Sequence, residues 1–253
     1  MTDAAAAFQD KRVFITGGNS GIGRAAAEAF ARGGARVAVM GRDARTLEET
    51  KTALGDGSLA IQGDVSRLPD IDTAVDAVRR EFGGLDALIV SAGISPMLPI
   101  EKVTEAFFDR VIGVNLKGAY FTMQKCAPLL ADGSAVVLLG SSGGSKGVGG
   151  LSVYSASKAG LRALARSFSA ELMPRRIRVN VLSPGPVLTP MLDRLEVPEH
   201  IAPQLTENIR RQVPLQRLGE VREIVSAIMF LASPGSAFIV GADLPADGGL
   251  TTL

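Results

Sequence analysis

The sequence is poor in residues that cross-link chains or bind metal ions. Its 253 residues include one cysteine, one histidine and no tryptophan. The single cysteine, Cys126, excludes an internal disulfide and favours a reducing compartment such as the cytoplasm. The one histidine, His200, stands alone, and no cluster of Cys, His and acidic residues has metal-ligand spacing. We therefore expect no metal site.

Excess charge and long apolar runs are also absent. The chain carries 27 Lys and Arg against 26 Asp and Glu, a net charge of +1, which gives no general attraction to nucleic acid or to an anionic membrane. No stretch approaches the ~18 apolar residues of a membrane helix. The N-terminus lacks the basic and apolar regions of a signal peptide. We expect a cytoplasmic protein that binds neither nucleic acid nor membrane.

Short apolar runs alternate with longer amphipathic stretches along the chain. This alternation predicts a parallel sheet with helices on both faces. We expect strands at 13–16, 37–40, 59–62, 87–90, 135–139, 178–182 and 238–244. We expect helices at 22–33, 43–54, 67–82, 103–130 with a break near Gly113, 151–173 and 219–232. No linker interrupts the pattern, so we interpret residues 1–253 as a single α/β domain, a doubly wound, Rossmann-like parallel sheet.

One long segment departs from this alternation. Residues 184–216 are rich in proline and begin with Pro184-Gly185-Pro186. A long insertion after a strand end of such a sheet is placed to cover a ligand. We interpret it as a lid or substrate loop, and a plain surface excursion is the alternative.

A glycine-rich segment follows the first predicted strand and opens the first predicted helix, with the spacing TGxxxGxG. Glycines let the backbone approach a pyrophosphate, and the helix N-terminus offers free N–H groups. A purely structural turn is the alternative. The expected cofactor contacts here are Gly17, Asn19, Ser20, Gly21, Ile22 and Gly23.

A tyrosine and a lysine lie four residues apart in the predicted helix 151–173. Tyr154 and Lys158 therefore project from one face on successive turns. The ordinary pKa of tyrosine is about 10, and a nearby ammonium lowers that pKa toward the range useful for acid/base catalysis. Upstream, a predicted strand ends in Ser141 and Ser142, where open parallel sheets bind ligands. A solvated helix edge and a capped strand end are the alternatives.

These motifs together resemble those of the short-chain dehydrogenase/reductase family. Further matches at family spacing extend the resemblance over about residues 11–249. Ser91 stands where the family usually has asparagine. The further matching segments are Gly63-Asp64-Val65, Ser91-Ala92-Gly93, Val114-Asn115-Leu116, residues 183–190 and Asp247-Gly248-Gly249.

The resemblance implies a role for each matching residue. Tyr154 would be the acid/base, Lys158 would lower its pKa and hold the nicotinamide ribose, and Ser141, rather than Ser142, would orient the substrate oxygen. Asn115 would hold a relay water beside Lys158. Cofactor contacts are implied for Asp64 and Val65 at the adenine, for Ser91, Ala92 and Gly93, and for Pro184, Gly185, Val187 and Thr189 at the nicotinamide.

The end of the second predicted strand bears on the choice of coenzyme. NAD-using members of the family usually carry an acidic residue there, which repels a 2′-phosphate. Here the strand ends in Gly41 and Arg42 follows, and a guanidinium can bind a phosphate bidentately. We therefore favour NADP(H), with NAD(H) as the alternative.

The sequence thus predicts an oxidoreductase that transfers a hydride between NADP(H) and a ketone or secondary alcohol. The alternatives are an NAD(H)-dependent alcohol dehydrogenase of the same fold and a non-catalytic nucleotide-binding regulator. We expect an apolar substrate pocket lined by residues 95–100, 143–151 and 188–197. The resemblance also implies a homotetramer paired through the helices at 103–130 and 151–173.

Overall fold

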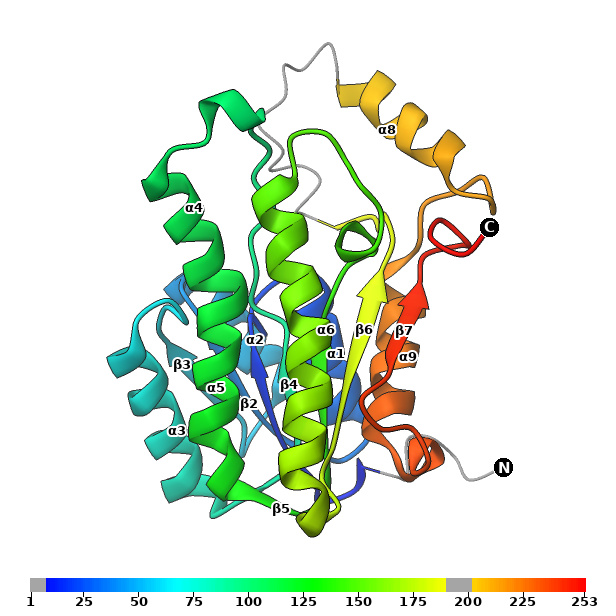
Figure 1. Ribbon diagram of the computed structural model, residues 1–253. Coiled ribbons are helices and arrows are strands. Elements are labelled where there is room, and N and C mark those ends of the chain that lie inside the picture. Colours follow the sequence, from blue (N-terminus) through cyan, green and yellow to red (C-terminus); the bar gives the residue numbers. More distant parts are fainter. Residues whose placement is uncertain (1–7, 190–201) are drawn as a thin grey trace.

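The computed structural model describes residues 8–189 and 202–253 and contains one parallel sheet (Figure 1). The strand order is β3-β2-β1-β4-β5-β6-β7. The predicted doubly wound parallel sheet is confirmed. The strands are β1 Arg12–Thr16, β2 Arg36–Gly41, β3 Leu59–Gln62, β4 Leu85–Val90, β5 Leu130–Leu139, β6 Arg178–Pro184 and β7 Asp243–Ala246.

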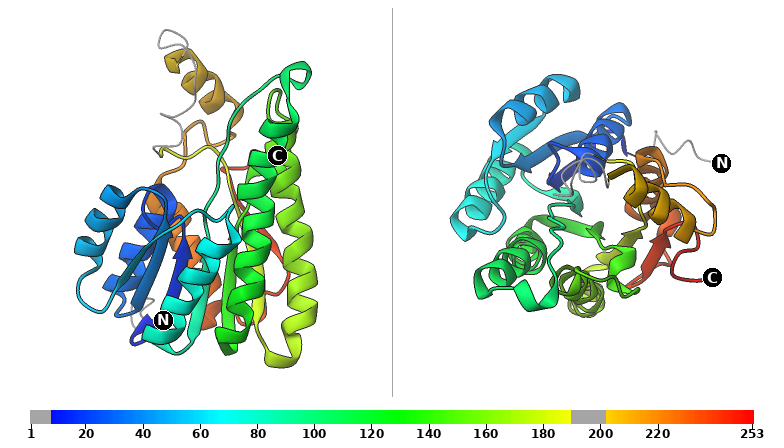
Figure 2. Two further views of the ribbon diagram at one scale, coloured as in Figure 1. Left: turned by 90° about the vertical axis from the view of Figure 1, so that its left-hand side faces the viewer. Right: turned by 90° about the horizontal axis from the view of Figure 1, so that it is seen from above.

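Helices cover both faces of the sheet (Figures 1 and 2). Helices α3, α5 and α6 pack on one face, and α1, α2 and α9 pack on the other. Helix α8 lies beyond the carboxyl ends of the strands. The helix bounds are α1 Gly21–Arg32, α2 Ala44–Leu54, α3 Leu68–Phe82, α4 Glu105–Ile112, α5 Gly118–Cys126, α6 Ser152–Leu172, α8 Ala202–Gln212 and α9 Val221–Ala232.

The central strands explain why the apolar runs in the sequence are continuous. Successive side chains of a strand point to opposite faces, and both faces of this sheet are covered. In β1, Phe14 packs into the core under α3, α5 and α6, whereas its neighbours Val13 and Ile15 pack into the core under α1 and α9. All three side chains are fully buried.

The strand order reverses direction between β1 and β4. Strand β1 pairs with β2 on one side and with β4 on the other. At such a switch point, the connections after the two strands leave to opposite faces and open a crevice at the carboxyl ends. The glycine-rich turn follows β1 and Ser91 follows β4, so both lie at this crevice.

Several element boundaries differ from the predictions. The predicted strand at 238–244 is wrong for residues 238–242, because β7 begins at Asp243 and the side chain of Phe238 is fully exposed. The predicted helix 103–130 begins at Glu105 and ends at Cys126, with a π-helical turn at Gly113–Lys117. The predicted lid contains helix α8; its residues 190–201, including His200, lie outside the described residues.

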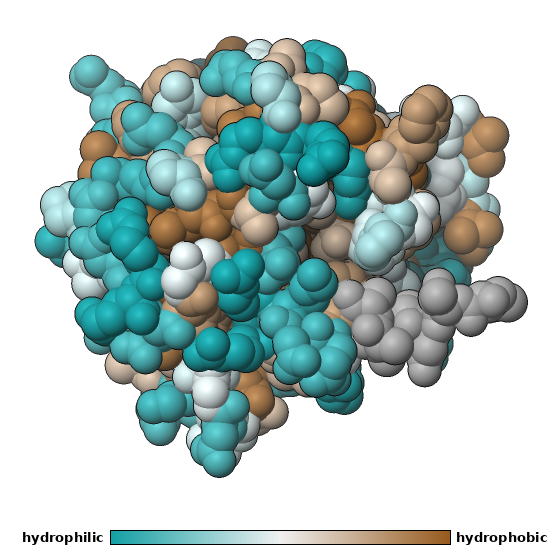
Figure 3. All heavy atoms as spheres, turned by 90° about the horizontal axis from the view of Figure 1, so that it is seen from below, coloured by the Kyte–Doolittle hydropathy of each residue, from teal (hydrophilic) through white to brown (hydrophobic). Residues whose placement is uncertain are grey.

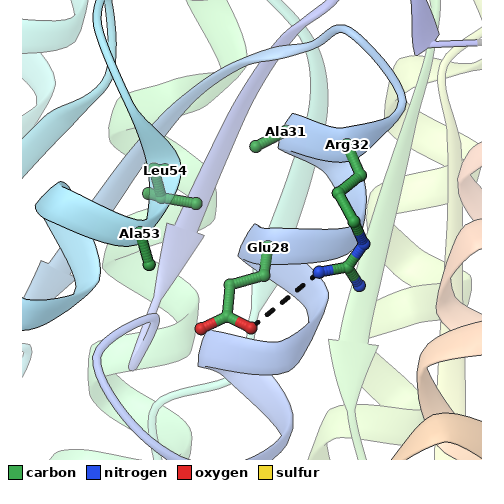
Figure 4. Close-up of a pocket in the computed structure, with 5 residues that line it drawn as sticks. All are labelled: Glu28, Ala31, Arg32, Ala53 and Leu54. Atoms are coloured by element: carbon green, nitrogen blue, oxygen red, sulfur yellow. Dashed lines mark ion pairs between the residues drawn. The ribbon is translucent and has the colours of Figure 1, made fainter.

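Two surface features lie away from the crevice. The opposite end of the molecule presents mostly hydrophilic residues, with smaller apolar areas between them (Figure 3). A small pocket between α1 and α2 is lined by Glu28, Ala31, Arg32, Ala53 and Leu54 (Figure 4). Its charged side chains, Glu28 and Arg32, pair with each other at 4.0 Å.

Within residues 8–189 and 202–253, no helix is both long and apolar enough to cross a membrane.

A buried arginine anchors the segment between α9 and β7. Arg178 opens β6 and is 8% exposed. Its guanidinium donates to the carbonyl oxygens of Ser236 at 2.9 Å, Ser233 at 3.1 Å and Leu231 at 3.3 Å. Burial lowers the pKa of this guanidinium below its ordinary value. The side chain therefore stabilises the fold by adding charge-assisted hydrogen bonds to carbonyl oxygens at the end of α9 and in the turn that follows it.

Replacing Arg178 tests that role. Arg178→Met keeps the apolar stem and removes a buried network of charge-assisted hydrogen bonds, so we expect the free energy of unfolding to fall by about 3 kcal/mol. Urea denaturation measures this change. The control is Arg32→Met, since that side chain is 71% exposed, and we expect a change within about 0.5 kcal/mol. Equal effects of the two substitutions would contradict the anchoring role.

Candidate active site

The glycine-rich turn lines the crevice with backbone. Gly17 and Gly21 have φ of +67° and +51°, a region that side chains with a Cβ disfavour. A Cβ at Gly17 would lie 2.8 Å from the Cα of Ala92. One at Gly23 would lie 2.2 Å from the carbonyl oxygen of Gly17. Because these positions leave no room for side chains, a ligand meets the backbone directly.

The N-terminus of α1 is free to bind an anion. Its N-cap residue, Ser20, makes no side-chain cap hydrogen bond, and no acidic residue occupies the first turn. The first N–H groups of a helix lack intrahelical partners and carry the positive end of the dipole. The turn and this helix end therefore fit the pyrophosphate of a dinucleotide. Ile22, the second residue of α1, packs against the apolar core.

At the end of β2, Asn19 fills the space beside Gly41. A Cβ on Gly41 would lie 2.1 Å from Oδ1 of Asn19. The Asn19 amide is held in place because its Nδ2 donates to Oγ1 of Thr46 at 2.7 Å. An acidic side chain at position 41 would therefore have to displace Asn19, and the rim here carries no carboxylate from the strand end.

Arg42 and Asp64, both predicted cofactor contacts, lie side by side on this rim. Their side chains form an ion pair at 3.8 Å, and the Arg42 side chain is 63% exposed. Asp64 also accepts hydrogen bonds from the backbone N–H and hydroxyl of Ser66, at 2.8 and 2.7 Å. The carboxylate is thus oriented locally, whereas the guanidinium remains accessible. Val65, the next residue, is buried.

The loop after β4 runs from the glycine-rich turn to the interior of the crevice. The N–H of Ser91 donates to the carbonyl oxygen of Thr16 at 3.2 Å, which ties this loop to β1. Ala92 lies against Gly17. A Cβ on Gly93 would lie 3.4 Å from both Oδ1 of Asn115 and Nζ of Lys158. Gly93 therefore adjoins the polar groups at the inner end of the crevice.

Asn115 lies in the π-helical turn and is 1% exposed. Its Oδ1 accepts from the N–H of Ile94 at 2.8 Å, and its Nδ2 donates to the carbonyl oxygen of Ile94 at 2.9 Å. Nδ2 also donates to Oγ of Ser157 at 3.1 Å. These three bonds satisfy a buried amide that would be costly to leave unpaired.

Ser157 is a contact that the sequence interpretation missed. It lies three residues after Tyr154 in α6, and its hydroxyl donates to the Tyr154 carbonyl oxygen at 2.6 Å. Its side chain is fully buried. The Ser157 hydroxyl oxygen also accepts a hydrogen bond from Asn115, so Ser157 joins the π-helical turn to the helix of Tyr154. The sequence could have indicated Ser157, because it lies between Tyr154 and Lys158 in the motif.

Lys158 is buried beside the end of β5. Its Nζ donates to the carbonyl oxygen of Leu139 at 2.6 Å and lies 5.9 Å from the centre of the Tyr154 ring. Burial lowers the pKa of the Lys158 ammonium to about 8. The cation is therefore fixed near the phenol and bears a proton that neutral to mildly alkaline conditions can remove.

Tyr154 projects into the same interior from α6. Burial raises the pKa of its phenol above the ordinary value, while hydrogen bonds with the side chains of Ser141 and Ser95 act in the opposite direction. The expected lowering of the Tyr154 pKa is thus wrong for the protein alone, because desolvation of the phenolate outweighs these hydrogen bonds. The phenol keeps its proton at neutral pH and can act as an acid.

Ser141 follows β5 and faces the phenol. Its Oγ accepts from the N–H of Gly143 at 3.1 Å, which begins the 3-10 turn Ser142–Gly144. A Cβ on Gly143 would lie 3.3 Å from Cε1 of Tyr154, so this glycine lets the turn approach the ring. Of the two candidate serines, Ser141 is the one whose hydroxyl lowers the pKa of the Tyr154 phenol. Ser142 is buried.

The segment after β6 closes the crevice from the other side. Gly185 passes against β7, since its Cβ would lie 2.6 Å from the Cα of Asp247. Val187 is buried and pairs with Gly219. Thr189 lies opposite the glycine-rich turn, with its Cβ 4.0 Å from where a Cβ of Gly21 would be. Pro184, at the end of β6, is also buried.

Ser95 is a second group that was not singled out. It was expected only as part of the pocket lining 95–100, yet its side chain is close enough to the Tyr154 phenol to lower the pKa of that phenol. Its backbone is constrained on both sides, by the bonds of Asn115 to Ile94 and by Pro96. In the described part of the chain, no group of three or more His, Cys, Asp or Glu side chains could hold a metal ion.

Comparison with known proteins agrees with this geometry. Residues 17–251 match the family model described as enoyl-(acyl carrier protein) reductase. Oxidoreductase asL5 of Sarocladium schorii is 41% identical over 245 residues, covering 96% of each chain. Levodione reductase of Leifsonia aquatica is 32% identical over 252 residues, covering 96% of this chain and 94% of that protein.

Solved structures show the same likeness. A short-chain dehydrogenase/reductase of Brucella melitensis superposes with a TM-score of 0.91 at 32% identity, covering 98% of this chain and 99% of that one. The structure of a levodione reductase gives a TM-score of 0.90 at 33% identity, covering 96% and 98%. With the glycine-rich turn, the Tyr154–Lys158 pair and these relatives together, the chain belongs to the short-chain dehydrogenase/reductase family and is an NAD(P)-dependent oxidoreductase of CH–OH and C=O groups.

Proposed function

We propose that this protein transfers a hydride between NADP(H) and a ketone or secondary alcohol, with Tyr154 as the acid/base. One observation carries the proposal. The Tyr154 phenol, the Ser141 hydroxyl and the Lys158 ammonium converge at the carboxyl end of the sheet. The crevice with the glycine-rich turn lies at the same end.

NADP(H) is the coenzyme we propose, with NAD(H) as the alternative. The support comes from the rim of the crevice, where Gly41 supplies no carboxylate and Asn19 occupies the space beside it. Arg42 is accessible there, and a guanidinium suits a 2′-phosphate. Binding of the 2′-phosphate by Arg42 would break the Arg42–Asp64 ion pair. Asp64 and Val65 would then contact the adenine ring.

The bound coenzyme supplies or accepts the hydride. In ketone reduction, Tyr154 gives its phenolic proton to the substrate oxygen, and the Ser141 hydroxyl orients that oxygen and stabilises its developing charge. Lys158 holds the ribose and stabilises the phenolate that remains. Asn115 holds the relay water that returns a proton. The nicotinamide amide would be held by the backbone of Val187 and the hydroxyl of Thr189, which follow Pro184 and Gly185. The same part of the crevice is lined by Ser91, Ala92 and Gly93.

The substrate we propose is a small or mid-sized ketone or secondary alcohol. Exposed Met97 and Leu188 and partly buried Leu98 supply apolar walls. The N–H of Leu98 donates to the carbonyl oxygen of Gly150 at 2.8 Å, which brings the two walls together. Met191 and Leu192, also expected in this lining, lie outside the described residues. One protein similar to this chain is named levodione reductase, and a reductase activity is consistent with such a pocket.

We further propose a single-domain subunit in a cytoplasmic homotetramer. Two apolar surfaces support the assembly. One is a groove along α5 and α6, lined by Ile112, Leu116, Lys117, Tyr120, Phe121, Gly160 and Leu164. The other lies near α9 and β7, with exposed Phe230, Phe238 and Val240. Exposed apolar surface of this kind marks interaction sites.

Tyr154→Phe tests the acid/base. The phenol hydroxyl supplies the proton, so we expect kcat for ketone reduction to fall by about 10³-fold, with NADPH affinity unchanged. The chain has two tyrosines, and Tyr120→Phe is the matched control because Tyr120 lies on α5 away from the reacting groups and the substitution keeps the ring that lines the α5–α6 groove. Turnover retained in Tyr154→Phe would overturn the mechanism.

Titration with NADPH and NADH, followed by nicotinamide fluorescence, tests the coenzyme. We expect tighter binding of NADPH and a loss of roughly tenfold for NADPH alone in Arg42→Gln. Arg45→Gln, whose parent side chain pairs with Glu49 on α2, serves as the control and should change neither constant. Preference for NADH, or equal weakening of both coenzymes by Arg42→Gln, would contradict the assignment.

The pH profile follows from the two titrating groups. Reduction needs the Tyr154 proton, whose pKa burial raises, and the Lys158 charge, whose pKa burial lowers to about 8. Raising the pH removes the Lys158 proton first, so reduction should slow as the pH rises through about 8. The Tyr154 proton leaves only at higher pH, because burial raises its pKa above the ordinary value, so oxidation, which needs the phenolate, should speed up only at the alkaline end of the range. Measurements of kcat/KM in both directions from about pH 6 to about pH 10 check this. Reduction that accelerates with pH would refute it.

A further inference from the structure

We propose that the Arg162–Asp243 ion pair positions Ser141 for the reaction by bracing its loop against the end of β6; this inference rests on the proposed function. Arg162 lies four residues after Lys158 on α6, so Tyr154, Lys158 and Arg162 follow one another along the same helix face. The first two residues serve the site directly. Arg162 contacts the structure behind it.

The guanidinium of Arg162 holds the loop that carries Ser141. It donates from Nη1 to the carbonyl oxygen of Gly144 at 3.2 Å and to Oγ of Ser145 at 2.9 Å. The loop rests directly on α6, since a Cβ on Gly144 would lie 3.1 Å from the backbone of Lys158 and Ala159. Gly144 ends the 3-10 turn that Ser141 begins. Fixing Gly144 and Ser145 therefore limits the movement of the Ser141 hydroxyl.

On its other side, the guanidinium meets β7. Nε of Arg162 lies 2.8 Å from Oδ2 of Asp243, whose side chain is 14% exposed. The second carboxylate oxygen, Oδ1, accepts from Oγ of Ser183 at 2.5 Å. Ser183 is buried in β6 next to Pro184 and touches Gly140, where a Cβ would lie 2.6 Å from its Oγ. The carboxylate thus reaches the strand that leads to Val187 and Thr189.

The contacts form one chain from Ser183 through Asp243 and Arg162 to Gly144 and Ser145. It spans the two segments that flank the reacting groups, one bearing Ser141 and the other the proposed nicotinamide contacts. A planar guanidinium can bond a carboxylate, a carbonyl and a hydroxyl at once, which an ammonium does less well. Small displacements of reacting groups lower rates strongly, so this brace should affect turnover more than binding.

Three variants test the proposal, namely Arg162→Gln, Asp243→Asn and the double mutant. Active sites are counted by NADPH titration, so that kcat refers to folded, coenzyme-binding protein. We expect Arg162→Gln and Asp243→Asn each to lower kcat about tenfold, with KM and the NADPH dissociation constant changed by less than about threefold. The double mutant should be no slower than the slower single mutant, because both changes break one brace. Arg162→Lys should restore kcat only in part.

Arg166→Gln is the matched control, since Arg166 lies one turn further along α6 with an exposed side chain, and it should leave kcat unchanged. Single variants with kcat within about twofold of the parent, or additive losses in the double mutant, would overturn the proposal. Failure of the proposed function is distinguishable: it would appear as turnover retained in Tyr154→Phe. Failure of the brace alone would leave Tyr154→Phe inactive and Arg162→Gln fully active.

Discussion

The buried side-chain amide of Asn115 joins three segments of chain that each carry part of the site. Its oxygen and nitrogen bind both backbone groups of Ile94, in the loop that continues from Ala92 and Gly93 to Ser95. Its nitrogen also bonds Ser157, one residue before Lys158. Because an unpaired buried amide is costly, the π-helical turn, the loop and α6 are held in a single arrangement. The relative positions of Ser95, Tyr154 and Lys158 depend on it.

Burial sets the chemistry of the groups that this amide brings together. Desolvation opposes charge, so it raises the pKa of the Tyr154 phenol and lowers that of the Lys158 ammonium to about 8. The two shifts favour a neutral phenol beside a cation that is easily deprotonated. A proton donor for a carbonyl substrate is therefore available at neutral pH, and the reverse reaction needs a phenolate that burial disfavours.

The sequence predicted features that depend on local patterns. Strands β1 to β6 appeared as apolar runs because both faces of the sheet are covered, and the glycine-rich turn appeared because its backbone excludes side chains. The start of β7 was misplaced, since an apolar run alone does not reveal that Phe238 faces solvent. The direction of the Tyr154 pKa shift, the hydrogen bond of Arg162 to Gly144 and the ion pair of Arg162 with Asp243 depend on burial and on distant segments. No local pattern encodes them.

Hydride transfer from NADPH to the substrate carbon at the Tyr154 centre is the central claim. The most direct test uses NADPH that carries deuterium in place of both hydrogens at carbon 4 of the nicotinamide, with a ketone that the protein reduces. Mass spectrometry and NMR of the product alcohol locate the label. We predict one deuterium on the carbinol carbon of the product. A product alcohol without deuterium on that carbon would contradict the account.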